Sequence, residues 1–316
     1  MTTLPIKPMI PATLGQGRST SLRRAREVVI VGTLIFCGLL TLLTTAGIVG
    51  VLLTQAWQFF QLPEVSFIEF MTGTRWSPLL GAEKHFGIWP LICGTFLVTA
   101  VAMGLALPLG LVTAIWLSEY APPLLRNVIK PVLEIIAGIP TVVFGFFALT
   151  VITPWLRSIH EGFNVYNVTS AGLAVGIMTL PIVTSLSEDA LRAVPRSLRE
   201  ASLGVGATKF ETSIRVVVPA ALSGIIAAFL LAIARAVGET MIVALAAGAQ
   251  SQLTLDPRES VQPMTGFMVQ MFLGDVSNFG VEYLSSYAVA ATLFVLTLAL
   301  TIIGHIIRVR FRQAYD

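Results

Sequence analysis

The sequence has few charged residues, and this scarcity excludes most soluble folds. Of its 316 residues, 20 are Lys or Arg and 17 are Asp or Glu, so 12% are charged; soluble domains carry about 25%. Because 55% of the residues are hydrophobic, too little polar surface remains to cover a water-soluble globule of this length. The same composition excludes disordered and collagen-like chains. It predicts a membrane protein.

The sequence also has little of the chemistry on which enzymes and metal sites depend. Its two cysteines, Cys37 and Cys93, lie within long uncharged runs, which is typical of small buried apolar side chains rather than of a disulfide or a metal site. Its three histidines are far apart, and the sequence contains neither a P-loop nor a His-Glu-x-x-His or Gly-x-Ser-x-Gly motif. We therefore expect no catalytic residues, no metal and no cofactor of the chain's own.

Six apolar intervals, five of them without a charged residue, are long enough to cross a membrane, which takes about 20 apolar residues. The first is too long for a secretory signal and lacks a cleavage pattern, so it is expected to remain as an anchor. Pro90 and Pro108 predict a kink or an early end in the second interval, and Gly172 with Gly176 predicts close helix packing in the fourth. The chain is therefore expected to be an all-α polytopic membrane protein with six transmembrane helices. The predicted spans are approximately Val28–Leu53, Gly87–Leu117, Ile135–Leu156, Val168–Leu186, Val216–Ala247 and Tyr283–Ile307.

The distribution of basic residues predicts the orientation. Six crossings place both termini on one side, and 15 of the 20 Lys and Arg residues fall on that side against four on the other. This asymmetry predicts a multi-pass protein of the plasma (inner) membrane with both termini in the cytoplasm. The basic residues lie in short runs between apolar stretches rather than on one face, which argues against a nucleic-acid partner.

The terminal and outer segments have their own compositions. Residues 1–22, rich in Pro, Ser and Thr, predict a flexible cytoplasmic tail, and residues 23–316 then form the six-helix transmembrane domain. Two outer segments, at about 58–86 and 248–282, contain aromatic, proline and acidic residues. They either dock an external partner or simply connect helices.

The segment between the fourth and fifth intervals carries the most specific pattern in the chain. It reads Glu200-Ala201-Ser202, then Gly206 after three residues and Val216-Val217-Val218-Pro219 after nine more. Small side chains allow a partner to approach closely, and glycine lets the chain turn. The pattern therefore predicts a short projecting helix, from about residue 197 to 205, that fits a cleft on a partner. A plain amphipathic connector is the alternative.

A second pattern lies inside the fifth interval, where Arg235 is followed at i+4 by Glu239. An Arg within a membrane span costs at least about 2.5 kcal/mol on insertion scales, so it normally faces a partner or a watery cavity. One hypothesis is an ion pair that only locks helix packing. The other is an oxyanion pathway, in which the guanidinium donates to phosphate-like oxygens and Glu239 accepts a hydrogen bond from an anion that carries a proton.

The Glu200–Pro219 spacing resembles the EAA loop of the binding-protein-dependent permeases of ABC importers. That loop reads Glu-Ala-Ala, three residues, Gly, nine residues and Ile-x-Leu-Pro; here Ser202 replaces the second Ala, and Val216 and Val218 replace Ile and Leu. The resemblance implies the MetI-like permease fold, with a cytoplasmic coupling loop at about 188–218. It also implies a cytoplasmic ATPase dimer that binds ATP and docks on this loop. The implied contact residues are Glu200, Ala201, Ser202 and Gly206.

Three further stretches narrow the resemblance to the PstC-type permeases of phosphate importers. They are Arg235–Met241, Ile139–Gly145 and the stretch from Gly94 to Glu119. Molybdate and sulfate permeases share an Arg-Ala-x-Gly-Glu run but usually continue with an aromatic residue, where this chain has Thr240. The implied substrate-pathway residues are Arg235, Glu239 and Thr240.

The phosphate-importer resemblance implies inward transport of inorganic phosphate. The implied partners are an external PstS-like phosphate-binding protein, a PstB-like ATPase dimer and a second, PstA-like permease subunit. Two alternatives stay open. One is a permease for another oxyanion, such as molybdate, sulfate or phosphonate, and the other is a stand-alone secondary transporter, against which the EAA-like loop argues.

Overall fold

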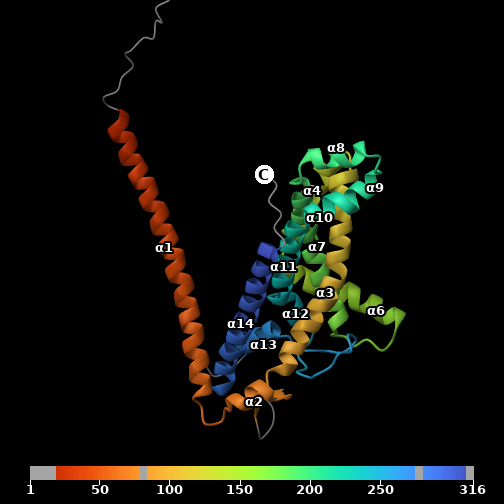
Figure 1. The fold of residues 1–316 in the computed structure, drawn as a ribbon. Helices are drawn as coiled ribbons and strands as arrows, with labels where there is room; N and C mark the ends of the chain where they lie inside the picture. The colour runs from red at the N-terminus through yellow and green to blue at the C-terminus, as the bar shows by residue number, and fades with distance from the viewer. Residues whose placement is uncertain (1–18, 79–83, 275–279, 311–316) are drawn as a thin grey trace, which may run out of the picture. The chain divides into compact units, whose positions relative to one another are not determined.

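The computed structural model describes residues 19–78, 84–274 and 280–310, and these residues are predominantly helical (Figure 1). Among the described residues, five helices are long and apolar enough to cross a membrane, or six if a pair bent by 70° counts as one broken span. The predicted all-α polytopic fold class is therefore confirmed. The chain divides into two units, residues 1–52 and 53–316.

Helix α1 (Ser19–Phe60) supplies the described part of the first unit. Its 42 residues extend about 63 Å. The Thr33 and Thr41 hydroxyls donate to carbonyls four residues earlier, at 2.8 and 2.9 Å, so these polar groups are satisfied within the helix. Residues 1–18 of the predicted flexible tail lie outside the described residues, and its last four residues belong to α1.

The core of the second unit is the pair α3 (Trp89–Ile115) and α7 (Val168–Arg192). A Cβ atom added at Gly172 would lie 2.6 Å from the Val101 side chain, and one added at Gly176 would lie 2.9 Å from a backbone oxygen of α3. The close packing predicted from these two glycines is confirmed. Helix α3 continues past Pro108 into a π-helical turn, η1 (Trp116–Tyr120), so the predicted early end was wrong.

The third predicted span begins later than Ile135. An amphipathic helix, α4 (Pro123–Ala137), comes first, and the span starts at Thr141. Gly138 caps the end of α4, and Pro140, whose ψ of 134° is not helical, precedes the first residue of α5, so the helix is interrupted here. The span itself consists of α5 (Thr141–Phe147), η2 (Ala148–Ile152) and α6 (Thr153–Ile159).

The fifth predicted span, Val216–Ala247, is interrupted at two points. The chain bends by 70° between Lys209–Ala220 and Leu222–Val237, and the helix then ends before Gly238. The elements in order are α10 (Val218–Ala220), α11 (Leu222–Val237) and α12 (Met241–Ala246).

Short elements cover the two ends of the second unit (Figure 1). One end carries α8 (Arg196–Gly204), α9 (Lys209–Thr212) and η3 (Ser213–Val217). The other carries α2 (Phe67–Thr72), the antiparallel strands β1 (Trp76–Ser77) and β2 (His85–Phe86), and α13 (Met264–Leu273). The last helix is α14 (Val281–Arg310).

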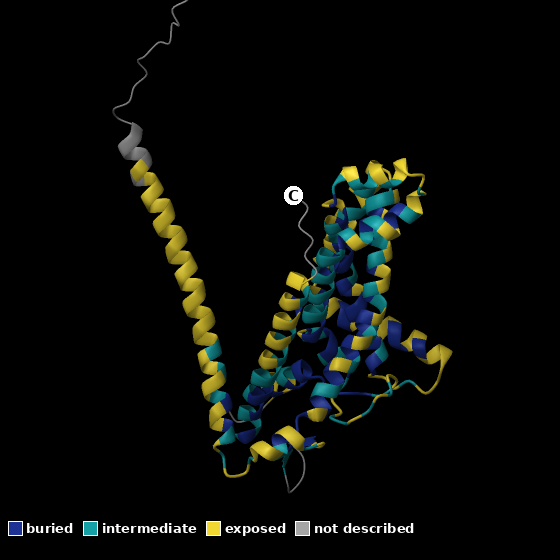
Figure 2. Ribbon diagram, viewed as in Figure 1, coloured by how far each residue is buried: buried dark blue, intermediate teal, exposed yellow. Residues whose placement is uncertain are grey.

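Buried residues concentrate along the middle of the second unit and at the β-hairpin end, whereas α8 is largely exposed (Figure 2). The hairpin end contains an aromatic cluster, whose rings meet edge to face. Its members are Phe59, Phe70, Trp76, Phe86 and Phe267. Parts of both predicted outer segments thus pack against each other rather than forming solvated connections.

Candidate functional site

The Arg235–Glu239 pair lies where α11 ends. Arg235 is in the last turn of α11, and its Nη1 donates to Glu239 Oε2 at 2.5 Å. About 20 Å of helix separates Leu222 from Arg235, so the pair lies at the end of α11 that is farther from the coupling loop. The i+4 reach expected from the sequence is present, although Glu239 has left the helix.

The interruption between α11 and α12 places each charge where backbone groups at a helix end stabilise it. A cation in the last turn of a helix interacts well with the unpaired carbonyls there, which suits Arg235. Glu239 Oε1 accepts from the backbone N–H of Ile242 at 3.4 Å, so the carboxylate also satisfies one of the N–H groups at the start of α12. The pair therefore stabilises the interruption between the two helices.

The two members of the pair differ in exposure. The Arg235 side chain is 40% exposed and that of Glu239 only 2%. Arg235 Nη2 also lies 3.5 Å from Met178 Sδ on α7, and Thr265 of α13 donates to the Glu239 carbonyl at 2.6 Å. The guanidinium is held in place while part of it faces open space, which is the arrangement that an oxyanion ligand requires.

Thr240 is adjacent to the pair but makes only a local bond. Its hydroxyl donates to the Gly238 carbonyl at 3.2 Å. The structure thus brings Arg235, Glu239 and Thr240 together in one interrupted segment.

The second region is the coupling loop. It consists of α8, α9 and η3 and lies at one end of residues 53–316. The predicted projecting helix is present as α8, with no buried residues. Glu200 and Ala201 are exposed, and the Ser202 hydroxyl lies 2.9 Å from that of Thr212. The face that the sequence assigns to a partner is open in this chain.

Gly206 ends α8 in a way that only glycine adopts readily. Its φ is +93°, and the N–H groups of Gly206 and Ala207 donate to the carbonyls of Leu203 and Ser202 at 3.0 and 3.2 Å. This pair of bonds is a Schellman motif. No heavy atom would lie within 4 Å of a Cβ atom at Gly206. Within this chain, glycine is therefore favoured here by the backbone conformation and not by a lack of space.

Arg199 anchors α8 to the membrane helices, a role that sequence reasoning missed. Its guanidinium donates to both carboxylate oxygens of Glu119 in η1, at 2.9 to 3.3 Å. It also donates to the carbonyls of Leu191 and Val194 at 2.8 and 2.6 Å. Arg199 and Glu119 are 80 positions apart, so no local pattern signals the contact.

Glu188 lies at the centre of an ion-pair cluster at the same end, which the sequence patterns did not predict either. Its carboxylate is 2% exposed and accepts from Arg126 Nε at 2.7 Å and Lys130 Nζ at 3.1 Å. Lys130 also contacts Asp189 at 2.7 Å. Burial opposes charging of Lys130, but these hydrogen bonds to Asp189 and Glu188 hold its pKa above the ordinary value. The cluster ties α4 to α7.

Neither region has the ligands of a metal centre. Within residues 19–78, 84–274 and 280–310, no group of three or more His, Cys, Asp or Glu side chains is placed to hold a metal ion. The two regions instead offer a half-exposed arginine side chain at the end of α11 and an exposed helix in the coupling loop.

Curated relatives share sequence with most of this chain. The chain is 33% identical over 261 residues to the probable ABC transporter permease protein YqgH of Bacillus subtilis, covering 83% of this chain and 84% of that protein. It is 34% identical over 229 residues to the phosphate transport system permease protein PstC of Mesorhizobium japonicum, covering 66% and 68%. It is 32% identical over 222 residues to PstA 1 of Mycobacterium tuberculosis, covering 70% of each.

Solved transporters share the fold. A chain of a bacterial alginate ABC transporter in complex with its alginate-bound periplasmic protein matches with a TM-score of 0.65 at 12% identity, covering 93% of this chain and 99% of that one. A chain of the MetNI methionine ABC transporter matches with a TM-score of 0.53 at 19% identity, covering 72% and 95%. The predicted MetI-like permease fold is confirmed.

The family model for binding-protein-dependent transport system inner membrane components matches residues 106–313. This range includes the coupling loop, the Arg235–Glu239 pair and the last span. The chain belongs to the family of binding-protein-dependent transport system inner membrane components, the permeases of ABC transporters.

Proposed function

We propose that this chain is a permease subunit of an ATP-driven importer that moves inorganic phosphate inward, and that Arg235 contacts the anion. The observation that carries the proposal is the half-exposed guanidinium of Arg235 at the break between α11 and α12. A planar fork of N–H donors matches two oxygens of a phosphate ion. Similarity to permeases named for phosphate transport supports this substrate.

Glu239 has two roles in this proposal. In the present arrangement its carboxylate orients the guanidinium, because it is buried and accepts from Arg235. When the anion binds and Arg235 shifts, the freed carboxylate oxygen accepts a hydrogen bond from P–OH. That bond favours a protonated oxyanion over sulfate, which is unprotonated at neutral pH. The Thr240 hydroxyl then turns from the Gly238 carbonyl and donates its one proton to the anion.

The coupling loop would connect transport to ATP hydrolysis on another subunit. The exposed face of α8 suits a cleft on a cytoplasmic ATPase dimer, and Arg199 with Glu119 would carry movement of α8 to η1 at the end of α3. The chain itself then performs no catalysis and binds no ATP. The residues proposed to contact the ATPase are Glu200, Ala201, Ser202 and Gly206.

The proposed assembly has further parts. A second permease subunit completes the pathway, and an external phosphate-binding protein delivers the ion. Both termini and the coupling loop lie in the cytoplasm, as the distribution of Lys and Arg favours. The same chemistry serves a second candidate substrate, another oxyanion such as arsenate or phosphonate, because Arg235 recognises oxygens rather than phosphorus.

Uptake of labelled phosphate by the complete transporter tests the role of Arg235. Cells lacking other phosphate importers would carry Arg235→Lys, Glu239→Gln, or Arg235→Met combined with Glu239→Gln. If Arg235 contacts the anion, the double variant stays inactive and Arg235→Lys is impaired, because an ammonium does not reproduce the planar fork. We expect Glu239→Gln to retain some uptake with weaker discrimination against sulfate.

Near-normal, phosphate-selective uptake by the double variant would contradict the proposal. Removing both charges together leaves neither one buried alone, so such a result would mean that the pair only locks the helix break. Protein amounts measured by blot control for loss of the subunit. Competition by arsenate and sulfate distinguishes a phosphate permease from a permease for another oxyanion.

A further inference from the structure

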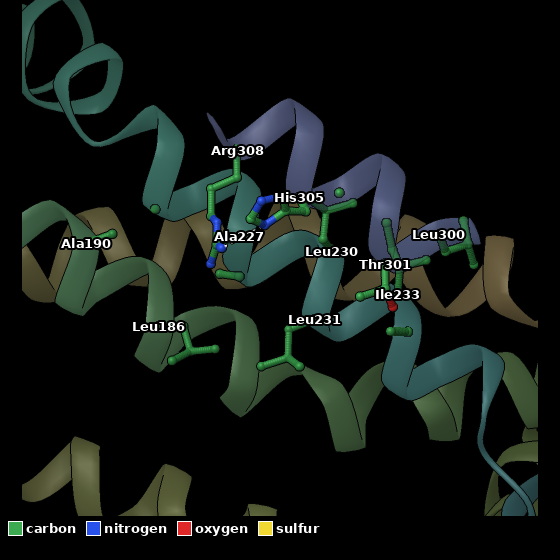
Figure 3. Close-up of a pocket in the computed structure, with 14 residues that line it drawn as sticks. Leu186, Ala190, Ala227, Leu230, Leu231, Ile233, Leu300, Thr301, His305 and Arg308 are labelled. Carbon is green, nitrogen blue, oxygen red and sulfur yellow. Dashed lines mark hydrogen bonds between the residues drawn. The ribbon is translucent and has the colours of Figure 1, made fainter. Parts of the chain in front are cut away.

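A groove lies between α7, α11 and α14, and its lining does not include Arg235, Glu239 or Thr240. Its volume is about 480 Å³, within the range of pockets that hold small molecules. It extends along α14 from Leu300 to Arg308, which is about 12 Å of helix. Figure 3 shows its lining side chains, which are mostly aliphatic.

Small residues on α11 form the floor of the groove. Ala227, Ala228 and Ala234 line it, and Gly224 lies so close to α7 that an added Cβ atom would be 2.4 Å from the Ala190 Cβ. Leu186 of α7 and Leu300 of α14 line its sides. These residues offer a long, narrow apolar surface, which an acyl chain fills by van der Waals packing rather than by leaving water, because lipid tails are as apolar as leucine.

One end of the groove is basic. Figure 3 shows Arg308 extending from α14 toward α11, with His305 beside it. The two side chains are 3.1 Å apart, from Arg308 Nη2 to His305 Nδ1. Because a guanidinium only donates, Nδ1 accepts, and the proton of a neutral imidazole is then on Nε2. Both side chains therefore present N–H donors at this end.

The basic end is the end of the groove nearer to the coupling loop. Ala190 is near the end of α7, Gly224 is near the start of α11, and both line the groove together with Arg308. The apolar part continues from there toward the middle of the span. A charged mouth at the membrane surface and an apolar interior are the two features of a phospholipid site.

We propose that this groove binds one acyl chain of an anionic phospholipid, whose headgroup phosphate contacts Arg308 and His305. Basic pockets between transmembrane helices suit anionic lipid headgroups, and the fork of Arg308 matches phosphate oxygens. A free phosphate ion would leave the apolar length of the groove unused. The lipid is a structural ligand here, so the site is independent of which ion the permease carries.

The test uses the full-length protein, purified in mild detergent and supplied with phosphatidylglycerol, phosphatidylcholine or inorganic phosphate. Native mass spectrometry measures retained lipid, and the thermal unfolding midpoint measures stabilisation. We expect phosphatidylglycerol to be retained and to raise the midpoint, with little effect of the other two additions. Arg308→Gln should weaken phosphatidylglycerol retention about fivefold, the effect of one basic residue near an anionic lipid surface.

Arg310→Gln is the matched control, because Arg310 is exposed on the same end of α14 and does not line the groove. It should retain phosphatidylglycerol as the unaltered protein does. Ala227→Leu narrows the groove and should reduce retention of any lipid. Equal retention of both lipids, equal losses in Arg308→Gln and Arg310→Gln, or stabilisation by inorganic phosphate alone would overturn the proposal. A groove covered by another protein segment would give the first of these results.

Discussion

The two ends of residues 53–316 are held together by different interactions. At the β-hairpin end, the aromatic cluster joins α2, both strands and α13, and four of its five rings are at most 1% exposed. At the coupling-loop end, α8 buries none of its residues and is anchored by the Arg199 guanidinium. One end is an extensive aromatic core, whereas α8 at the other end is held by the Arg199 ion pair and by partly buried Leu198, which packs against a small apolar cluster that includes Leu191.

This difference matches what each end is proposed to do. Apolar side chains are densely packed, and any displacement weakens their van der Waals contacts. The hairpin end therefore holds its elements in fixed positions relative to one another. Ion pairs act at single points and leave the remaining surface of α8 available. An element that has to contact an ATPase and pass on its movement needs an open face and a defined attachment, and the charged end provides both.

The largest expected effect is in the aromatic cluster. Phe267→Ala should lower the free energy of unfolding by about 3–5 kcal/mol, because it removes a buried ring and leaves a cavity. The matched control is Phe146→Ala, whose side chain is 64% exposed. Denaturant unfolding of the purified protein measures both. Similar losses in the two variants would mean that the cluster does not form a core.

A smaller effect is expected at the anchor of α8. Arg199→Ala leaves the Glu119 carboxylate, which is 8% exposed, without its main donor, and this should cost about 1–3 kcal/mol. Arg199→Lys should recover only part, because an ammonium lacks the fork that reaches both oxygens. Arg196→Ala, at an exposed position of the same helix, is the control. Faster proteolysis within residues 196–210 of Arg199→Ala would report release of α8, and an unchanged rate would refute the anchor.

The smallest effect is expected at the turn after α8. Gly206→Ala and Gly206→Leu should each cost about 1–2 kcal/mol, from a left-handed backbone conformation, and should not differ because the space around the position is open. Gly206→Asn should cost less. In the assembled transporter, Leu should impair ATPase association more than Ala if the partner approaches this residue. Equal association of the two variants would remove Gly206 from the proposed contact.

The approximate positions of the membrane spans were predictable, because a transmembrane helix depends on the residues of one continuous segment. Every predicted span overlaps helical structure, since about 20 apolar residues cross a bilayer wherever they occur. Two details of the spans were not predicted. The third span begins at Thr141 rather than at Ile135, and the fifth is interrupted after Arg235, between α11 and α12. The length of an apolar interval does not indicate where one helix ends near a proline or where a carboxylate caps the next helix.

Local patterns in the chain were enough to predict the helical membrane class, the coupling-loop spacing from Glu200 to Pro219 and the i+4 proximity of Arg235 and Glu239. The partners of Glu119 and Glu188, the assembly of the aromatic cluster and the basic groove at Arg308 became visible in the folded molecule. The two groups differ in the separation of the residues along the chain. Hydropathy, helix periodicity and turn chemistry act over a few residues, whereas these contacts join segments that meet only after the helices have packed.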